Sequence, residues 1–279
     1  MKPKLDPVRG FFNKWEMYKI VKEKPAPYFR IPHTDVFSRE SFEQFISNYG
    51  CIFIKSVFTF GGEKISKITK ENGQLVWKLQ GHPGKRFDQN EPLFAELSAV
   101  YNDELCIVQE GAPLLMYKDR PIDIRAHLQR DLDENWVYAG DLVRVGGPDS
   151  IVSNFESNGT VEPTNKVLST LFKSQERATQ ILEHVAKSAM HICHLLDEHD
   201  IFMEAGIDFG VDDKGELWLI EVNTNDSQGA PDRALFKRLP DQTYYNDIMT
   251  RLTRVNEQLV KDLFTYFEEY VKKNKNERV

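Results

Sequence analysis

Cysteine is scarce in this chain of 279 residues, and its three cysteines, Cys51, Cys106 and Cys193, each lie in an apolar segment outside any paired motif. A disulfide scaffold is therefore excluded, and buried thiols in a reducing compartment are expected. No apolar run approaches the length of a membrane span, and the first residues lack the apolar core of a signal peptide. We expect a cytoplasmic protein without a membrane partner.

Several functional motifs are also missing. The chain has no Walker-type phosphate loop, no Gly-x-Ser-x-Gly turn and no zinc-type spacing of cysteine and histidine. His191 and His194 share a helix face, but Cys193 points elsewhere and no fourth ligand is evident, so a transition-metal site is not expected. The net charge is −7 with both signs interspersed, which argues against a dedicated nucleic-acid surface.

Apolar residues make up 41% of the chain, enough for a full core in one large domain or two closely joined lobes. The predicted order is a small α+β lobe followed by a larger one, and the absence of a strictly alternating βαβ run argues against a Rossmann fold. Helices are predicted over 11–23, 38–50, 92–100 and about 167–197, and strands over 51–55, 65–68, 75–79, 105–109, 121–146 (a hairpin) and 207–225 (a second hairpin). A closing helix is predicted to face the core with the stripe Ile248, Leu252, Val255, Leu259, Leu263, Tyr266 and Tyr270.

The hairpin over 207–225 is the most informative stretch of the chain. With a four-residue loop, Asp208 lies opposite Leu219 and shares a sheet face with Glu221 and Asn223. Two carboxylates and an amide oxygen are hard ligands suited to Mg²⁺ or Mn²⁺. A three- or five-residue loop would turn Asp208 to the other face. The alternative is a solvent-facing edge, which is what we expect for the charges at the tip: Asp212, Asp213, Lys214 and Glu216.

Two further segments are candidates for nucleotide binding. Lys55 ends a buried strand and leads into a loop that carries Gly62, so it could present an ammonium group to a polyphosphate, although lysines often end strands for no functional reason. The backbone from Gln109 to Gly111 could offer hydrogen bonds to a purine edge, with Glu110 reaching a ribose hydroxyl. The alternative for this segment is a plain linker.

A third candidate segment is rich in charge. Asp123, Arg125 and His127 fall on one face of a predicted strand, Arg144 lies on the partner strand, and Asn154 follows. Guanidinium groups pair with oxyanions in a bidentate way, which suits phosphoryl or acyl-phosphate chemistry. Surface ion pairs are the competing interpretation.

Taken in order, these segments resemble the ATP-grasp superfamily, and most closely its YheC/YheD-type, spore-coat-associated family. The segments that carry the resemblance are Asn13-Lys14-Trp15 with Tyr18, Ile31-Pro32-His33-Thr34, Ile52-Phe53-Ile54-Lys55, Ile107-Val108-Gln109-Glu110-Gly111, Pro121-Ile122-Asp123-Ile124-Arg125, Gly140 to Asn154, Asp208 with Glu221 and Asn223, and Tyr244-Tyr245.

The resemblance implies an α+β ATP-grasp fold in which two α+β lobes clasp a nucleotide. Residues 1–108 would hold the opening helices and the small lobe, at about 51–108, and residues 109–279 the large lobe with the metal site and the C-terminal helix. The implied nucleotide-binding residues are Lys14, Lys55 and Gly62 on the phosphates, Gln109, Glu110 and Gly111 at the adenine hinge, and Asp123. The implied catalytic residues are Arg125, Arg144 and Asn154, and the implied ligands of Mg²⁺ or Mn²⁺ are Asp208, Glu221 and Asn223.

The implied reaction is ATP-dependent activation of a small-molecule or peptide carboxylate as an acyl phosphate, which an amine then attacks. A phosphotransferase acting on a hydroxyl and a non-catalytic protein of the spore coat are the alternatives. Two departures from the family pattern stand out. Only Gly62 matches the expected glycines of the phosphate loop, because Thr59 and Lys64 occupy two of their places. The chain also begins at the opening helix, so we expect no preceding domain, and expect substrate contacts from the loop 226–233 with Lys237 and Arg238.

Overall fold

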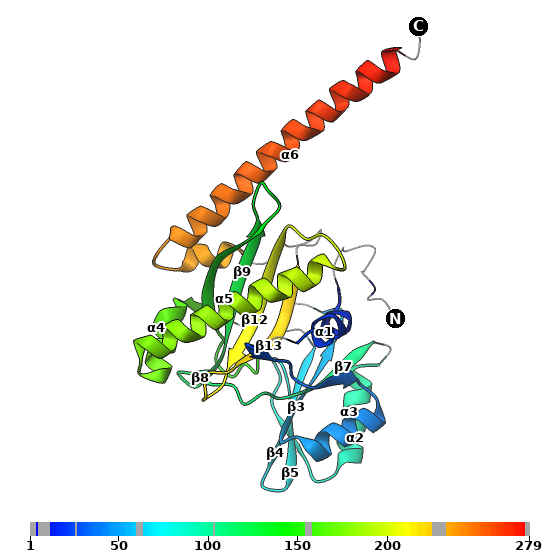
Figure 1. Cartoon of the computed structure of the whole chain (residues 1–279). Coiled ribbons are helices and arrows are strands. Elements are labelled where there is room, and N and C mark those ends of the chain that lie inside the picture. Colours follow the sequence, from blue (N-terminus) through cyan, green and yellow to red (C-terminus); the bar gives the residue numbers. More distant parts are fainter. Residues whose placement is uncertain are drawn as a thin grey trace.

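Two β-sheets with helices packed against them make up the body of the protein (Figure 1). The computed structural model describes residues 4, 12–25, 27–59, 64–102, 104–153, 158–224 and 233–276, with side chains as far as residue 270. This mixture of helices and sheets confirms the predicted α+β class. None of the helices in the described ranges is long and apolar enough to cross a membrane.

The smaller sheet has six antiparallel strands, and two helices cover one of its faces. Phe42 and Phe45 pack with Leu93 against Ile54 in a fully buried core. The spatial order of the strands is β2 (Thr34–Val36), β7 (Cys106–Glu110), β3 (Cys51–Ser56), β4 (Ile65–Glu71), β5 (Gln74–Leu79) and β6 (Lys85–Phe87), and the helices are α2 (Arg39–Asn48) and α3 (Asn90–Val100).

Local sequence signals account for much of this lobe. The Ser38 side chain accepts a hydrogen bond from the Ser41 N–H and forms a capping box, so the predicted start of α2 is confirmed. Asn72 and Gly73 have φ values of 49° and 82°, the left-handed conformation that a two-residue hairpin needs at both positions. The predicted hairpin between β4 and β5 therefore forms at this dipeptide.

The larger sheet carries one face of apolar residues and one of polar residues. Along its central strand, Ile124 and Ala126 pack in the main core. Arg125 and His127, which alternate with them, point to the other side of the sheet. The spatial order is β1 (Phe29–Arg30), β13 (Leu217–Thr224), β12 (Glu204–Val211), β9 (Arg120–Arg130), β10 (Trp136–Val145) and β11 (Thr160–Glu162), with β8 (Met116–Tyr117) also on β9. The apolar face is covered by α1 (Lys14–Glu23), α4 (Thr164–Phe172) and α5 (Gln175–Asp197).

The single long helix predicted over about 167–197 is wrong, because the chain breaks there into α4 and α5. Lys173 takes a left-handed conformation, with φ at 52°, and ends α4. The Ser174 side chain then accepts a hydrogen bond from the Arg177 N–H and caps α5. Apolar spacing continues across the break, so periodicity alone does not reveal it.

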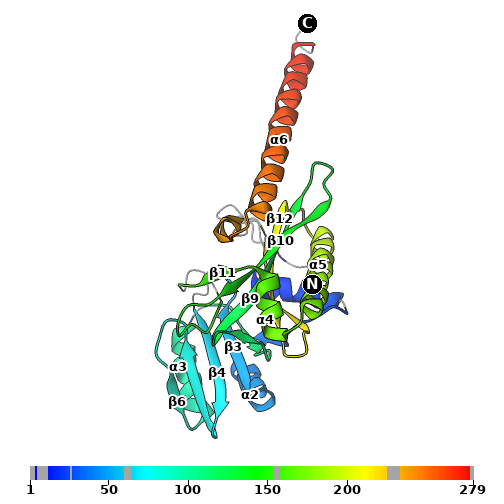
Figure 2. The ribbon, with the colours of Figure 1, turned by 90° about the vertical axis from the view of Figure 1, so that its left-hand side faces the viewer.

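The closing helix α6 (Thr243–Asn276) extends away from the body, as both views show (Figures 1 and 2). Ile248 at its base is fully buried beside Phe236 of the 3₁₀ helix η2 (Arg233–Arg238). Farther along, Leu259 is 56% exposed and Tyr266 is 61% exposed. The prediction that the whole stripe faces the core is therefore wrong beyond the base of the helix.

The opening elements divide between the two sheets. Strand β1 pairs with β13 of the larger sheet, and α1 packs in the core of that sheet. Strand β2 and helix α2 instead belong to the smaller sheet. The division of the chain into residues 1–108 and 109–279 stays a prediction.

Candidate active site

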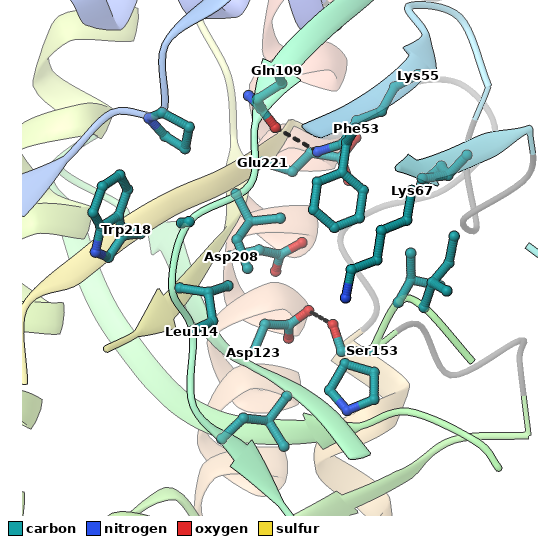
Figure 3. A pocket seen from close by; sticks show the side chains of 18 of the residues that line it. Phe53, Lys55, Lys67, Gln109, Leu114, Asp123, Ser153, Asp208, Trp218 and Glu221 are labelled. Carbon is teal, nitrogen blue, oxygen red and sulfur yellow. Dashed lines mark hydrogen bonds between the residues drawn. The ribbon is translucent and has the colours of Figure 1, made fainter. Parts of the chain in front are cut away.

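A pocket of about 190 Å³ lies between the polar face of the larger sheet and the smaller sheet (Figure 3). We call the wall from β3 and β4 the roof, and the wall from β9, β10, β12 and β13 the floor. The roof contributes Cys51, Phe53, Lys55, Ile65 and Lys67, the floor contributes Ile122, Asp123, Arg144, Asp208, Trp218, Leu219, Ile220 and Glu221, and the segment that joins them contributes Gln109, Glu110, Ala112, Leu114 and Leu115. Lys14 also lines the pocket. The pocket therefore brings together most of the predicted site residues.

The hairpin of β12 and β13 reaches the predicted arrangement by a different register. Val211 pairs with Leu217, which leaves residues 212–216 as the loop, and Asp208 pairs directly with Glu221. A loop of this length would turn Asp208 away from Glu221, but a β-bulge at Ile220 adds one unpaired residue and restores the shared face. The predicted pairing of Asp208 with Leu219 is wrong, whereas the predicted shared face of Asp208 and Glu221 is confirmed.

The tip of this hairpin is more ordered than the charge pattern suggests. Asp212 is buried, and its carboxylate accepts hydrogen bonds from the Lys214 and Glu216 N–H groups and from the Trp218 indole at 3.1 Å. The prediction that Asp212 faces solvent is therefore wrong. Its carboxylate closes the loop and fixes the end of β13.

Four charged side chains form a buried ion cluster on the floor. Arg144 makes a bidentate pair with Asp123, at 2.8 and 2.6 Å, and its Nη2 lies 2.7 Å from Asp208 Oδ2. Arg125 makes a second bidentate pair with Asp208, and the Ser153 hydroxyl donates to Asp123. Asp123 and Arg125 share a face of β9 as predicted, Arg144 lies opposite Asp123 on the partner strand, and the charges of the cluster compensate one another.

Burial and pairing compete in setting the protonation of this cluster. Burial raises the pKa of Asp123 in spite of the Arg144 guanidinium beside it. Burial acts on Asp208 in the same direction, but Arg125 and Arg144 outweigh it and lower the pKa of that carboxyl. Asp208 is therefore held as a carboxylate, and Asp123 is the member of the cluster that protonates first.

The three predicted metal ligands converge beside this cluster. The Asn223 amide donates to Asp208 Oδ2 at 3.2 Å, and Glu221 Oε1 lies 3.1 Å from the Lys14 ammonium. Within the described ranges no group of three or more His, Cys, Asp or Glu side chains is placed to hold a metal ion. Two carboxylates and an amide that could turn its oxygen inward nevertheless form a donor set that fits Mg²⁺.

Lys55 and Gln109 connect the roof to the segment that joins the sheets. The Lys55 ammonium donates to Gln109 Oε1 at 2.6 Å, and the Gln109 amide donates to Thr34 Oγ1 at 2.9 Å. Burial lowers the pKa of Lys55 to about 8. Lys55 lies at the pocket wall, where the charge of the Glu221 carboxylate acts on it, but within the described part of the chain it makes no ion pair.

The backbone of the predicted adenine hinge is already hydrogen-bonded. The Glu110 N–H donates to the His33 carbonyl at 2.8 Å, and the Gly111 N–H donates to the Cys51 carbonyl at 2.8 Å. The Glu110 carboxylate accepts from the His33 N–H at 3.0 Å. The N–H groups of Glu110 and Gly111 are therefore engaged within the protein, and the next residue, Ala112, lines the pocket.

Gly111 is required by the close approach of β3. A Cβ at this position would lie 2.5 Å from Cys51 Sγ and 2.9 Å from the Cys51 carbonyl oxygen. We expect Gly111→Ala to lower the free energy of unfolding by about 1–3 kcal/mol, because backbone must move to relieve the clash. Gly84→Ala, whose Cβ would have 3.6 Å to the nearest atom, is the control and should change stability by less than about 0.5 kcal/mol. Urea unfolding of both variants measures the difference, and equal stabilities would contradict this account of the hinge.

Some predicted residues fall elsewhere, and some pocket residues were missed. Gly62 and Asn154 lie outside the described residues. His127 is fully buried against Phe236, with a ring-centroid distance of 5.7 Å, and does not line the pocket. Lys67 does line it and was missed, although its alternation with Ile65 on β4 could have placed it on the roof.

Two sheets close on a pocket with lysines in the roof and carboxylates in the floor, which is consistent with an ATP-grasp fold. The family model for YheC/D-like ATP-grasp proteins matches residues 7–255, and the chain belongs to this family. Endospore coat-associated protein YheD of Bacillus subtilis (strain 168) is 25% identical over an alignment of 238 residues, and the match covers 82% of this chain and 50% of that relative. The chain thus spans about half the length of the curated relative that it matches. The predicted family and fold are confirmed.

Proposed function

We propose that the protein binds ATP with Mg²⁺ in this pocket and uses it to activate a carboxylate as an acyl phosphate for attack by an amine. The observation that carries the proposal is the placement of Asp208 and Glu221 on the floor of a pocket that Lys14 and Lys55 also line, with Asn223 on the same sheet face donating to Asp208. Family membership supports the use of ATP. The carboxylate and amine substrates are small molecules or peptides in this proposal, and no nucleic acid takes part.

The nucleotide would lie between apolar side chains of the two walls. Phe53 and Ile65 line the roof, and Leu219 and Ile220 line the floor, which suits a purine ring. The purine edge would face Ala112, and the phosphates would extend towards Lys14 and Lys55. An ammonium group on each side suits the charge of a polyphosphate.

Binding would then exchange one set of ionic partners for another. Glu221 now pairs with Lys14, so a phosphate that takes the Lys14 ammonium frees the Glu221 oxygens. Those oxygens, with the oxygens of Asp208 and Asn223, would hold Mg²⁺, which supplies neutralisation of the phosphate charge. Lys14 and Glu221 thereby act as a preformed pair that the ligand separates.

The chemistry itself needs no nucleophile from the protein. A substrate carboxylate oxygen attacks the terminal phosphorus and ADP leaves, and an amine then attacks the acyl carbon and inorganic phosphate leaves. The amine proton passes to solvent or to the departing phosphate. In this scheme Arg144 stabilises charge on the transferred group, and the pocket walls hold the reactants together.

A non-catalytic role is the second candidate, and one contact favours it. Both oxygens of Asp208 are engaged by Arg125 and Arg144, so this carboxylate has less capacity for a metal than an open ligand would have. The matched relative also carries the name of an endospore coat-associated protein. The same fold could therefore serve as a structural component of a spore layer.

Calorimetric titration with ATP, with and without Mg²⁺, tests the proposal. We expect micromolar, Mg²⁺-dependent binding by the wild type, and a loss of at least about 100-fold in Glu221→Gln, because an amide is a much weaker metal ligand than a carboxylate. Glu216→Gln on the same hairpin is the matched control, since the Glu216 carboxylate makes an exposed pair with Arg30 outside the pocket and the substitution should leave binding unchanged. Absence of binding in all three proteins would support the structural role, and equal binding in all three would refute the assignment of Glu221.

The type of reaction is decided by a trapping experiment. The protein is incubated with ATP, Mg²⁺ and hydroxylamine against a panel of amino acids and dicarboxylic acids. A hydroxamate forms only if a carboxylate has been activated. Release of ADP without a hydroxamate, on addition of hydroxyl compounds, would instead identify a phosphotransferase.

A further inference from the structure

Lys67 projects into the pocket from the roof (Figure 3). It lies on β4 directly across from Phe53 of β3, and its neighbour Ile65 pairs with Lys55. Side chains alternate along a strand, so Ile65 and Lys67 share the face that looks onto the pocket. Figure 3 shows the Lys67 side chain pointing to the side of the pocket where Asp123 and Ser153 lie.

Lys67 differs in its partners from Lys14 and Arg144, and from Lys55, which donates to Gln109 Oε1. Lys14 pairs with Glu221, and Arg144 pairs with Asp123 and Asp208. Within the described residues the Lys67 ammonium makes no ion pair, and it rests 5.9 Å from the centre of the Phe53 ring. It is a positive charge in a pocket whose floor carboxylates are already compensated by arginine and lysine.

The position of Lys67 separates it from the lysines already assigned to the phosphates. Cys51 marks the end of the roof next to the hinge, because its carbonyl accepts from Gly111, and Lys55 marks the other end of β3. Strand β4 lies one strand farther from β7 than β3 does. Lys67 therefore lines the side of the pocket that is farther from β7. Arg144 of the floor and Ser153, from the segment after β10, also line the pocket.

We propose that Lys67 is an oxyanion-binding residue that holds the terminal phosphate of the nucleotide from the roof, opposite the Arg144 guanidinium of the floor. The proposal rests on the function proposed above. An ammonium on one side and a guanidinium on the other neutralise charge on the transferred phosphoryl group from two lobes. Lys67 comes from the smaller sheet and Arg144 from the larger sheet. A terminal phosphate held by both cations would therefore link the two sheets across the pocket.

Titration of Lys67→Met with ATP, ADP and adenosine, each with Mg²⁺, tests this assignment. We expect ATP affinity to fall at least about 10-fold, ADP affinity to fall less than about threefold, and adenosine affinity to stay unchanged, because only ATP carries the phosphate in question. Lys67→Arg should retain most of the ATP affinity. Lys70→Met is the matched control, since Lys70 is an exposed lysine of the same strand, and it should bind all three ligands as the wild type does.

The outcomes separate this proposal from the one on which it rests. Wild-type binding of ATP together with unchanged binding by Lys67→Met would overturn the role of Lys67 and leave the proposed function standing. An equal loss for ATP, ADP and adenosine would also overturn it, because that pattern indicates a packing role beside Phe53. A wild type that binds no nucleotide would overturn both. Thermal unfolding of Lys67→Met, expected to match the wild type, excludes misfolding as the cause of a selective loss.

Discussion

Arg144→Met is expected to lower the free energy of unfolding by about 3–5 kcal/mol, because it would leave the buried Asp123 carboxylate without its bidentate partner and remove one of the two cations on Asp208. Both carboxylates are almost fully buried, so water cannot replace the lost contacts. Denaturant unfolding measures the change. Arg39→Met is the matched control, because Arg39 pairs with Glu91 at the surface. This substitution should lower the free energy of unfolding by no more than about 1 kcal/mol.

The loss of unfolding free energy in Arg144→Met should also depend on pH. Burial already raises the pKa of Asp123 in the wild type, and loss of the guanidinium would raise it further. A carboxyl whose folded-state pKa lies above its unfolded value binds a proton more readily when folded, so the penalty is present at high pH and shrinks as the pH falls. We expect a smaller difference from the wild type at about pH 5 than at about pH 8. A deficit that is constant over this range would show that lost packing, and not an unpaired carboxylate, is responsible.

The second large effect is expected for Lys55→Met, which should weaken ATP binding by at least about 100-fold, since it removes an ammonium group that lines the pocket and makes no ion pair within the described chain. Stability should change by less than about 1 kcal/mol. Removal of a buried charge is favourable, but Gln109 Oε1 loses its donor, and the two effects oppose each other. Calorimetry and urea unfolding on the same samples measure both quantities, and Lys85→Met, an exposed lysine of β6, is the control.

The pKa of Lys55 gives this assignment a second test. Burial lowers that pKa to about 8, so the ammonium is largely protonated at neutral pH and loses its proton above this value. Wild-type affinity for ATP should therefore fall as the pH rises from 7 to 9, and the residual affinity of Lys55→Met should not follow that fall. An identical pH profile in both proteins would exclude Lys55 as the titrating group.

The features that the sequence predicts well are those encoded by adjacent residues. The hairpin at Asn72-Gly73, the cap at Ser38 and the alternation along β9 all follow from local backbone preference or strand periodicity. The shared face of Asp123 and Arg125 follows in the same way. These signals place the strands of the sheet that carries the site, whereas the family is indicated by the order of the motifs along the chain.

The features that the sequence does not predict depend on residues far apart in the chain. The break at Lys173 interrupts a continuous apolar pattern, and the exposed part of α6 has the same spacing as a core helix. The pairing of Arg125 with Asp208 depends on which strand lies next to β9. That strand is β12, which is separated from β9 in the sequence by β10, β11, α4 and α5. Alternation along β4 places Lys67 on the same face as Ile65, but which face of β4 meets the pocket depends on the order of the strands in the sheet.

The β-bulge at Ile220 has a consequence for how this hairpin tolerates insertions and deletions. Loss of Ile220 would bring Glu221 next to Leu219 and shorten the stretch after Asp208 by one residue, yet Asp208 and Glu221 would remain opposite each other. Loss of Val222, two positions later, would instead turn Asn223 towards the core. A constant number of residues between Asp208 and Glu221 is therefore no requirement of the site, whereas the single residue between Glu221 and Asn223 is.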